Sequence, residues 1–149
     1  TGGRIRAIEK YLDGEDFLIT YGDGIANVDL TSLKARHEEL GSALTITTTQ
    51  PQSRFGVVEI GESGLVSRFL EKPPGNEIIN IGYMIAKHSV FEYLKDDGPL
   101  EEKPLRDLAA SGQLGAYSHS GFWQPMDTVR EAELLNSIWN KGSAPWKIW

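Results

Sequence analysis

Residues 17–21, Phe-Leu-Ile-Thr-Tyr, have apolar or β-prone side chains at consecutive positions rather than at alternate ones. This run is typical of a strand buried on both faces, because a strand with one solvent face alternates apolar and polar residues. Helix-period segments flank it, with residues 5–12 before it and residues 30–40 after it. Asp29 is expected to cap the second helix and Gly41 to end it. A buried strand between two helices predicts an α/β fold.

The rest of the chain first continues this alternation and then departs from it. Residues 43–49 are rich in β-branched side chains and predict a second strand. Residues 55–60 and 65–71 predict a hairpin around the Gly-Glu-Ser-Gly turn at 61–64. Further elements are expected as strands at 78–86 and 114–119 and as helices at 88–94, 104–110 and 129–139. Consecutive strands after an alternating start predict a mixed sheet, parallel in part with an antiparallel insertion.

Composition excludes several classes of protein. The 149 residues are 40% hydrophobic, which is enough for one domain with its own core and excludes global disorder. A formal net charge of −6 argues against a generic binder of nucleic acid or of anionic membranes. The absence of cysteine excludes disulfides and thiolate nucleophiles. No apolar run approaches the roughly 20 residues that span a bilayer, and no basic-then-apolar leader is present, so a cytoplasmic location is expected.

The first candidate for chemistry is Asp23, which lies between Gly22 and Gly24 just after the first predicted strand. Open α/β sheets bind ligands at the carboxyl ends of their strands, and flanking glycines let a ligand approach the backbone. A carboxylate at this point suits a hard cation such as Mg²⁺. The alternative is a strand-ending turn with an exposed aspartate.

The second candidate is Asp127, in the segment 121–128 that joins a predicted strand to the last predicted helix. Asp127 is expected at or beside the N-cap of this helix, so one interpretation gives it only a capping role. Two acids at strand ends on one edge of a sheet can instead share a metal ion, and magnesium commonly takes one or two carboxylates.

The third candidate group is Glu71, Lys72 and Asn80. Lys72 is a compact positive charge suited to a phosphate, and Glu71 can accept hydrogen bonds from sugar hydroxyls. Asn80 can both donate and accept. The alternatives are a solvated Glu-Lys pair at a strand end and an edge amide satisfied by the backbone.

Other side chains favour no separate chemistry. The histidines lack His-x-x-x-His spacing, which argues against zinc, and His37 is expected on a polar helix surface. No serine lies in a nucleophile-elbow setting. Trp146 and Trp149 are expected to dock on the core or on a neighbouring subunit.

Several motifs together resemble the glucose-1-phosphate cytidylyltransferase family of sugar-phosphate nucleotidyltransferases, from the first residue to the last. The motifs are Thr1-Gly2-Gly3-Arg4, Tyr21-Gly22-Asp23-Gly24, Arg54-Phe55-Gly56, Glu71-Lys72-Pro73, Gly121-Phe122-Trp123-Gln124-Pro125-Met126-Asp127-Thr128 and Gly142-Ser143-Ala144-Pro145-Trp146-Lys147. The Trp-Gln-Pro-Met-Asp-Thr string and the Ala-Pro-Trp-Lys string are the specific ones.

The resemblance implies a Rossmann-like mixed β-sheet flanked by helices, of the nucleotide-diphospho-sugar transferase type. It implies an oligomeric enzyme that joins CTP to α-D-glucose 1-phosphate with Mg²⁺ as cofactor. The product, CDP-glucose, supplies dideoxysugars for surface polysaccharide such as lipopolysaccharide O-antigen. Asp23 and Asp127 match the family's magnesium ligands, and Lys72 matches its phosphate-contacting lysine. The remaining matches are Glu71 and Asn80 at glucose-contacting positions and Thr1, Gly2 and Gly3 in a loop near the nucleotide base.

Departures from the family pattern leave alternatives open. Ile81 stands where the family commonly has glycine, and it adds a Cβ and bulk that could narrow the sugar site. The family's Gly-x-Gly-Thr-Arg loop has no match, so residues 1–149 are expected to be the carboxyl-terminal part of a single nucleotidyltransferase domain that cannot complete a CTP site alone. Competing hypotheses are a uridylyl- or thymidylyltransferase relative and a non-catalytic sugar-phosphate-binding or assembly module.

Overall fold

The centre of the molecule is a four-stranded mixed sheet. The computed structural model describes residues 1–53, 55–95 and 97–148, so Arg54 of the motif above and Trp149 lie outside the described residues. The strands lie in the order β1 (Phe17–Thr20), β6 (Ile79–Ala86), β3 (Leu44–Thr49) and β7 (Leu114–Ser118). β6 is antiparallel to β1 and β3, whereas β3 is parallel to β7. The prediction of a mixed sheet in an α/β fold is confirmed.

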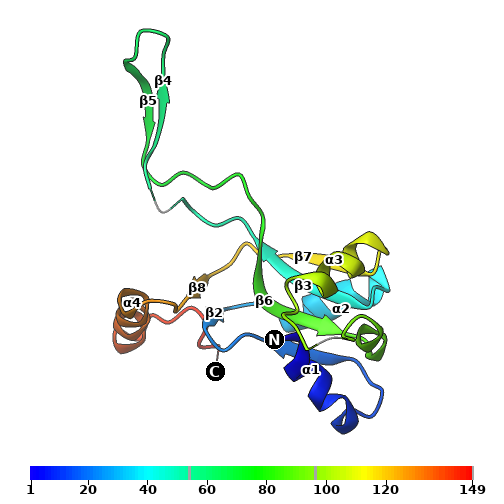
Figure 1. The fold of residues 1–149 in the computed structure, drawn as a ribbon. Coiled ribbons are helices and arrows are strands. Elements are labelled where there is room, and N and C mark those ends of the chain that lie inside the picture. Colours follow the sequence, from blue (N-terminus) through cyan, green and yellow to red (C-terminus); the bar gives the residue numbers. More distant parts are fainter. Residues whose placement is uncertain (54, 96, 149) are drawn as a thin grey trace.

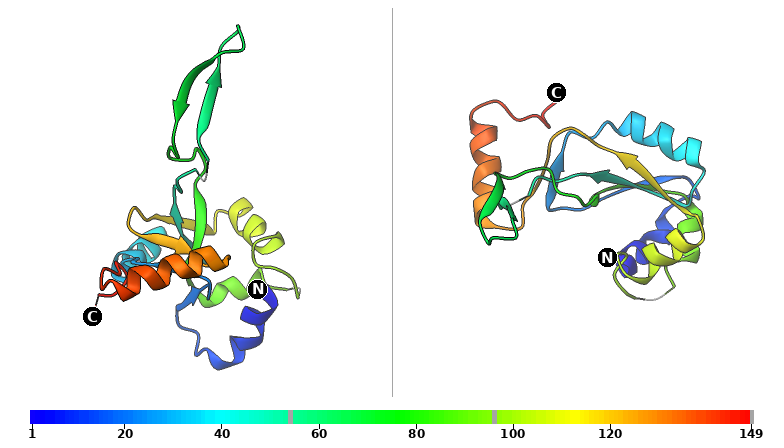
Figure 2. Two further views of the ribbon diagram at one scale, coloured as in Figure 1. Left: turned by 90° about the vertical axis from the view of Figure 1, so that its left-hand side faces the viewer. Right: turned by 90° about the horizontal axis from the view of Figure 1, so that it is seen from above.

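Helices cover both faces of this sheet (Figures 1 and 2). α2 (Leu30–Leu40) packs on one face, and α1 (Gly2–Ile8), η2 (His88–Glu92) and α3 (Lys103–Ala110) pack on the other. Strand β3 serves both layers: Leu44 lies in the main apolar core with residues of α1, η2 and α3, while Thr45 contacts α2. The alternation along this strand therefore directs Leu44 and Ile46 toward the main core and Thr45 toward α2.

The ends of α2 follow from local chemistry. Asp29 accepts hydrogen bonds from the backbone N–H groups of Thr31 and Ser32, at 2.9 and 3.0 Å, and so caps the helix as predicted. Gly41 ends it in the left-handed conformation, with φ of 65°, which glycine adopts without steric cost.

Two small sheets lie outside the central one. β2 (Gly24–Ala26) pairs with β8 (Trp123–Pro125), and both lie in segments for which the sequence predicts no secondary structure, because three residues show no periodicity. β4 (Val57–Ile60) and β5 (Val66–Leu70) form the predicted hairpin, which projects away from the body of the molecule (Figures 1 and 2). The remaining elements are η1 (Glu9–Tyr11) and α4 (Val129–Asn140).

Two sequence-based expectations about the amino-terminal region are wrong. β1 is an edge strand and is not buried on both faces, because Leu18 (57% exposed) and Thr20 leave one of its faces open to solvent. Gly2 and Gly3 do not form a loop but begin α1, with Thr1 as N-cap. A Cβ on Gly2 would lie 2.7 Å from the Gly98 carbonyl oxygen, and the Gly3 N–H donates to that oxygen at 3.2 Å. These glycines therefore allow close packing of the helix start against the segment before α3.

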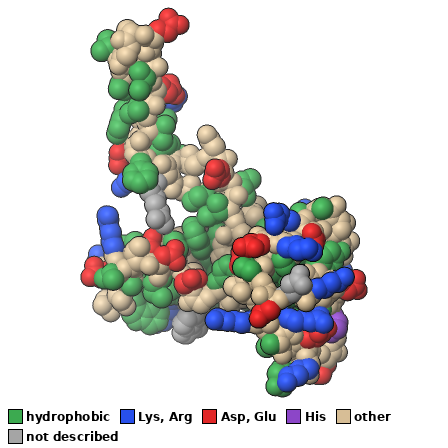
Figure 3. Space-filling view, in the orientation of Figure 1, with side chains coloured by type: hydrophobic (Ala, Val, Ile, Leu, Met, Phe, Trp, Pro, Cys, Tyr) green, Lys and Arg blue, Asp and Glu red, His purple; other side chains and the backbone are tan. Residues whose placement is uncertain are grey.

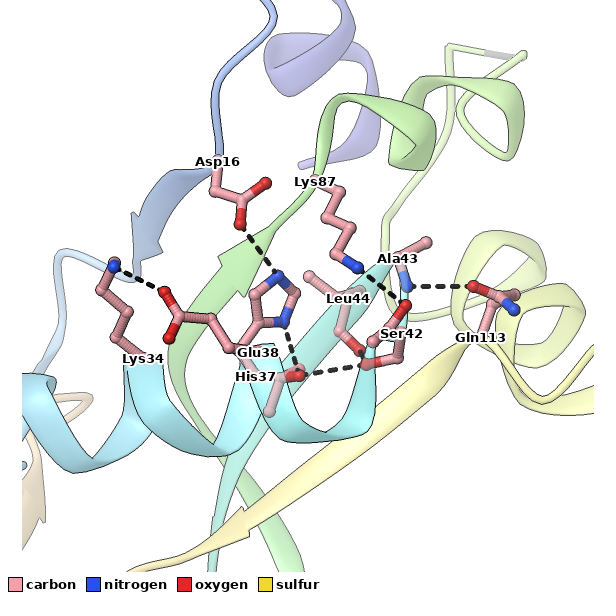
Figure 4. A network of polar contacts seen from close by, with 11 residues as sticks. Asp16, Lys34, His37, Glu38, Ser42, Ala43, Leu44, Lys87 and Gln113 are labelled. Carbon is pink, nitrogen blue, oxygen red and sulfur yellow. Dashed lines mark hydrogen bonds and ion pairs between the residues drawn. The ribbon is translucent and has the colours of Figure 1, made fainter.

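His37 is buried, with 1% of its surface exposed, and the expectation that it lies on a polar helix surface is wrong. Its Nδ1 lies 2.7 Å from the Thr45 hydroxyl on β3, and its Nε2 lies 3.6 Å from the Asp16 carboxylate (Figure 4). Burial lowers the pKa of His37 below its usual value, and Lys87 lowers it further, against the opposing effect of Asp16. His37 is thus a neutral core residue that joins α2 to the sheet.

Trp146 docks on the chain itself, as expected for one of the two tail tryptophans. Its ring lies 5.3 Å from Phe122 and 6.5 Å from Trp139, measured between ring centroids. The Lys147 ammonium lies over the Trp139 ring, with Nζ 5.2 Å from the centroid, which is close enough for a cation–π contact. These contacts fix the segment after α4 against the helix and the β8 region.

Candidate active site

The pairing of β2 with β8 brings Asp23 and Asp127 to the same end of one small sheet. Gly24 is opposite Pro125, and the Met126 N–H donates to the Asp23 carbonyl oxygen at 2.7 Å. Asp23 therefore lies beside Met126, and Asp127 is the next residue along. Both aspartates are exposed. Residues from distant parts of the sequence are neighbours here because two three-residue strands pair.

Asp127 is not the helix cap. Thr128 is the N-cap of α4, and its hydroxyl accepts a hydrogen bond from the Glu131 N–H at 3.2 Å. The Glu131 carboxylate in turn accepts from the N–H groups of Thr128 and Asp127, each at 3.0 Å. This capping box provides acceptors for backbone N–H groups at the start of α4, so the Asp127 carboxylate is not required to cap the helix.

The donor set at this point fits a hard cation such as magnesium. Across the residues that the structure describes, no cluster of three or more His, Cys, Asp or Glu side chains could enclose a metal ion. Asp23 and Asp127 offer two exposed carboxylates, and Mg²⁺ is commonly held by one or two carboxylates with water and substrate phosphate oxygens completing its shell. The residues present therefore fit the metal that the sequence predicts.

Lys72 has an unusual backbone. Its φ is 44°, and it is the one non-glycine residue with positive φ in the described part of the chain. This conformation costs a residue with a Cβ roughly 1–2 kcal/mol. The Lys72 ammonium lies 3.8 Å from the Glu71 carboxylate, and both side chains are more than half exposed, so the ion pair contributes little to stability. Non-glycine residues with such a backbone cluster at active sites and ligand clamps, which is consistent with a functional role for Lys72.

A cleft of about 1040 Å³ opens beside Lys72. Lys72 and Gln50 line it from the base of the hairpin, and Trp123, Thr128 and Arg130 line it from β8 and the start of α4. This volume lies just above the range of roughly 300–1,000 Å³ that is usual for small-molecule sites. Arg130 is a second cation in this cleft, and sequence reasoning missed it because it belongs to no motif.

Asn80 lies at the start of β6, half-buried, opposite Thr48 of β3. Its Oδ1 accepts a hydrogen bond from the Gly82 N–H at 3.0 Å, so this oxygen is used by the backbone. Ile81 is buried, with 3% of its surface exposed, so its side chain presents almost no surface to a ligand.

Thr1 and Tyr21 meet at a residue that no sequence pattern singled out, Glu101. The Glu101 carboxylate accepts hydrogen bonds from the hydroxyls of Thr1, at 2.6 Å, and of Tyr21. Partial burial and the neighbouring Glu101 raise the pKa of Tyr21 well above its usual value. Burial acts against the ionised form of Glu101, but the two hydroxyl donors outweigh it and hold the Glu101 pKa below its usual range.

Comparison with known proteins shows the family to which the chain belongs. Residues 2–123 match the nucleotidyl transferase family. The chain is 43% identical to glucose-1-phosphate cytidylyltransferase of Salmonella typhi over 152 residues, which covers all of this chain and 59% of that protein. It is 30% identical to glucose-1-phosphate adenylyltransferase of Clostridium novyi over 170 residues, covering 97% of this chain and 44% of the relative.

Solved structures show the same fold. HddC from Yersinia pseudotuberculosis superimposes with a TM-score of 0.64 over 90% of this chain and 60% of that one, at 24% sequence identity. The chain thus spans about three-fifths of the length of the cytidylyltransferase and of the structure that it matches. No helix in the described ranges is both long and apolar enough to cross a bilayer.

Proposed function

Because the chain belongs to the nucleotidyl transferase family, we propose that its protein transfers CMP from CTP to α-D-glucose 1-phosphate, giving CDP-glucose and pyrophosphate. The observation that carries this proposal is the juxtaposition of Asp23 and Asp127 by β2 and β8, next to the cleft that Lys72 lines. The 43% identity to a glucose-1-phosphate cytidylyltransferase over the full chain supports the choice of substrates.

The reaction needs no nucleophile from the protein. A phosphate oxygen of glucose 1-phosphate attacks the α-phosphorus of CTP, the new P–O bond forms, and the bond to the β-phosphate oxygen breaks to release pyrophosphate. The protein has to align two anions and offset their charge. Serine and histidine side chains are consequently not needed at the site, and none is among the described residues that line the cleft.

The proposed roles follow from side-chain chemistry. Asp23 and Asp127 hold Mg²⁺, which when bound offsets the negative charge of the triphosphate. Lys72 contacts the phosphate of the sugar, and Asn80 and Glu71 contact the sugar hydroxyls. Thr1, Gly2 and Gly3 lie near the nucleotide base. CDP-glucose formed in the cytoplasm would supply synthesis of surface-polysaccharide dideoxysugars.

A homo-oligomer is part of this proposal. The hairpin carries apolar side chains that are largely exposed, among them Ile60 (65%) and Phe69 (60%) (Figure 3). A two-stranded hairpin is only marginally stable in water, so a partner surface that covers it would stabilise it. Light scattering on the complete protein tests this, and a strictly monomeric mass contradicts it.

The test of the reaction uses the complete protein that carries residues 1–149. It is incubated with glucose 1-phosphate, Mg²⁺ and one of CTP, UTP, dTTP or ATP, and the products are resolved by ³¹P NMR. CDP-glucose with equimolar pyrophosphate, and a preference for CTP, is the expected result. A preference for UTP or dTTP would assign the protein to another specificity. Binding of glucose 1-phosphate without product from any nucleotide would make it a non-catalytic module.

A further inference from the structure

Glu101 lies between the two regions of the proposed site. It lies in the segment before α3. In the sequence it is 100 residues from Thr1 and 80 residues from Tyr21. Both of its oxygens are used: Oε2 accepts from the Thr1 hydroxyl and Oε1 accepts from the Tyr21 hydroxyl. A carboxylate suits this place because it has only acceptors and can take two hydroxyl donors at once.

The contact with Thr1 has a fixed direction. The Thr1 oxygen accepts a hydrogen bond from the Leu100 N–H at 2.8 Å, so its proton is directed to Glu101. Thr1 is the N-cap of α1, and the Gly3 N–H donates to the Gly98 carbonyl oxygen. The start of α1, where the nucleotide base is proposed to bind, is therefore attached to the Glu101 segment at three points.

The contact with Tyr21 connects Glu101 to the segments that carry Asn80 and Asp23. The Tyr21 N–H donates to the Gly82 carbonyl oxygen at 3.0 Å, and its side chain lies so close to Gly82 that a Cβ there would be 2.7 Å from Cδ2. The Gly82 N–H in turn donates to Asn80. Tyr21 is also two residues before Asp23, whose charge acts on its hydroxyl. Tyr21 thus contacts the strand that carries Asn80 and begins the turn that carries Asp23.

We propose that Glu101 is a positioning residue. Through Thr1 it holds the start of α1, where the nucleotide base is proposed to bind. Through Tyr21 it holds the turn that carries Asp23, and it thereby fixes these two parts of the site relative to each other. This inference rests on the proposed function and adds a residue to it. In this role Glu101 does not contact the reacting atoms. It keeps the two substrates at the separation that in-line attack requires, and a small misplacement of reacting groups can cost a large factor in rate.

The experiment uses the complete protein and four single variants, with Glu102→Gln as the matched control. Glu102 is the adjacent exposed glutamate, and its side chain does not cap α3. Glu101→Gln leaves the size unchanged but removes one acceptor. Tyr21→Phe and Thr1→Val each remove one hydroxyl from one end of the network. KM for CTP, KM for glucose 1-phosphate and kcat are measured for each, together with the thermal unfolding midpoint.

The role of Glu101 predicts a split between the kinetic constants. Thr1→Val should mainly raise KM for CTP, and Tyr21→Phe should mainly lower kcat, each by about 10-fold. Glu101→Gln should do both, and the Tyr21→Phe/Glu101→Gln double variant should have the kcat of the slower single variant, because the two residues act through one contact. Glu102→Gln should match the wild type. If Glu101→Gln does not fold, the two hydroxyl variants still carry the test.

The outcomes separate this inference from the function on which it rests. A wild-type protein that forms no nucleotide sugar overturns the proposed function, and the role of Glu101 with it. An active wild type in which Glu101→Gln has the same kinetic constants as Glu102→Gln overturns only the role of Glu101. Equal decreases in kcat for Thr1→Val and Tyr21→Phe, with both KM values unchanged and the unfolding midpoints lowered, also overturn it, because they would indicate general loss of folded protein.

Discussion

Thr128 and Glu131 satisfy each other's hydrogen-bonding groups at the start of α4, through a capping box that leaves the Asp127 side chain without a capping role. Thr128→Ala should therefore lower the free energy of unfolding by about 1 kcal/mol, which is the usual cost of losing an N-cap side chain. Asp127→Asn should leave the free energy of unfolding nearly unchanged. Urea denaturation of both variants checks this, and the reverse order of stabilities would return Asp127 to a structural role.

Lys72 is expected to lower the stability of the fold while it contributes to substrate binding. Its φ of 44° favours glycine, so Lys72→Gly should be more stable than Lys72→Ala by about 1 kcal/mol. Both variants should raise KM for glucose 1-phosphate in the complete protein by a similar factor, because both lose the ammonium. Denaturation curves and initial rates measure the two effects. Alanine and glycine variants of equal stability would show that the backbone at Lys72 is not strained.

Gly82 should tolerate no side chain, for a reason beyond its φ of 81°. A Cβ at Gly82 would lie 2.7 Å from the Tyr21 ring, whereas Gly112, with φ of 69°, has nothing within 4 Å of such a Cβ. Gly112→Ala should thus lose about 1 kcal/mol from backbone strain alone. Gly82→Ala should lose more, since it also displaces Tyr21. Similar losses for the two variants, measured by thermal or urea unfolding, would contradict the close contact with Tyr21.

His37 should make the fold sensitive to mild acid. Its pKa is lowered by burial in the folded chain and returns to about 6.5 on unfolding, so the unfolded chain binds the proton more readily. The free energy of unfolding should therefore fall as the pH decreases below about 6.5. The charged groups that face the ring are Asp16, Lys87 and Glu38.

The measurement is the free energy of unfolding at about pH 7 and about pH 5, on either side of the unfolded-state pKa, for the wild type, His37→Gln and His88→Gln. His37→Gln should lose most of the dependence over this interval, and His88→Gln should keep it. An unchanged dependence in His37→Gln would assign the acid sensitivity to other groups.

Sequence patterns were sufficient where structure depends on neighbouring residues. The bounds of α2 follow from a capping aspartate and a terminating glycine, and the hairpin follows from its turn. They failed where the outcome depends on position in the sheet. The composition of residues 17–21 is that of a buried strand, yet β1 is at the sheet edge. His37 has polar sequence neighbours, yet its ring faces Thr45 on another element.

In the candidate site too, some residues could be predicted from the sequence and others could not. Asp23, Lys72 and Asp127 belong to motifs of residue types that suit metal and phosphate, so the sequence alone marks them as candidates. Glu101 has no such mark, because its partners are 80 and 100 residues away and nothing in its local sequence distinguishes it. The pairing of β2 with β8 was equally unpredictable, since strands of three residues have no recognisable pattern.

Asp23 and Asp127 are proposed to act together, as ligands of one magnesium ion in a cytidylyltransferase. The most direct measurement is the rate of CDP-glucose formation by the complete protein carrying Asp23→Asn, Asp127→Asn or both, with Glu133→Gln on the exposed side of α4 as control. Each single variant should lose about 100-fold or more in rate, and the double variant should be no slower than the slower single one. Losses that multiply in the double variant, or single variants as active as Glu133→Gln, would contradict a shared site.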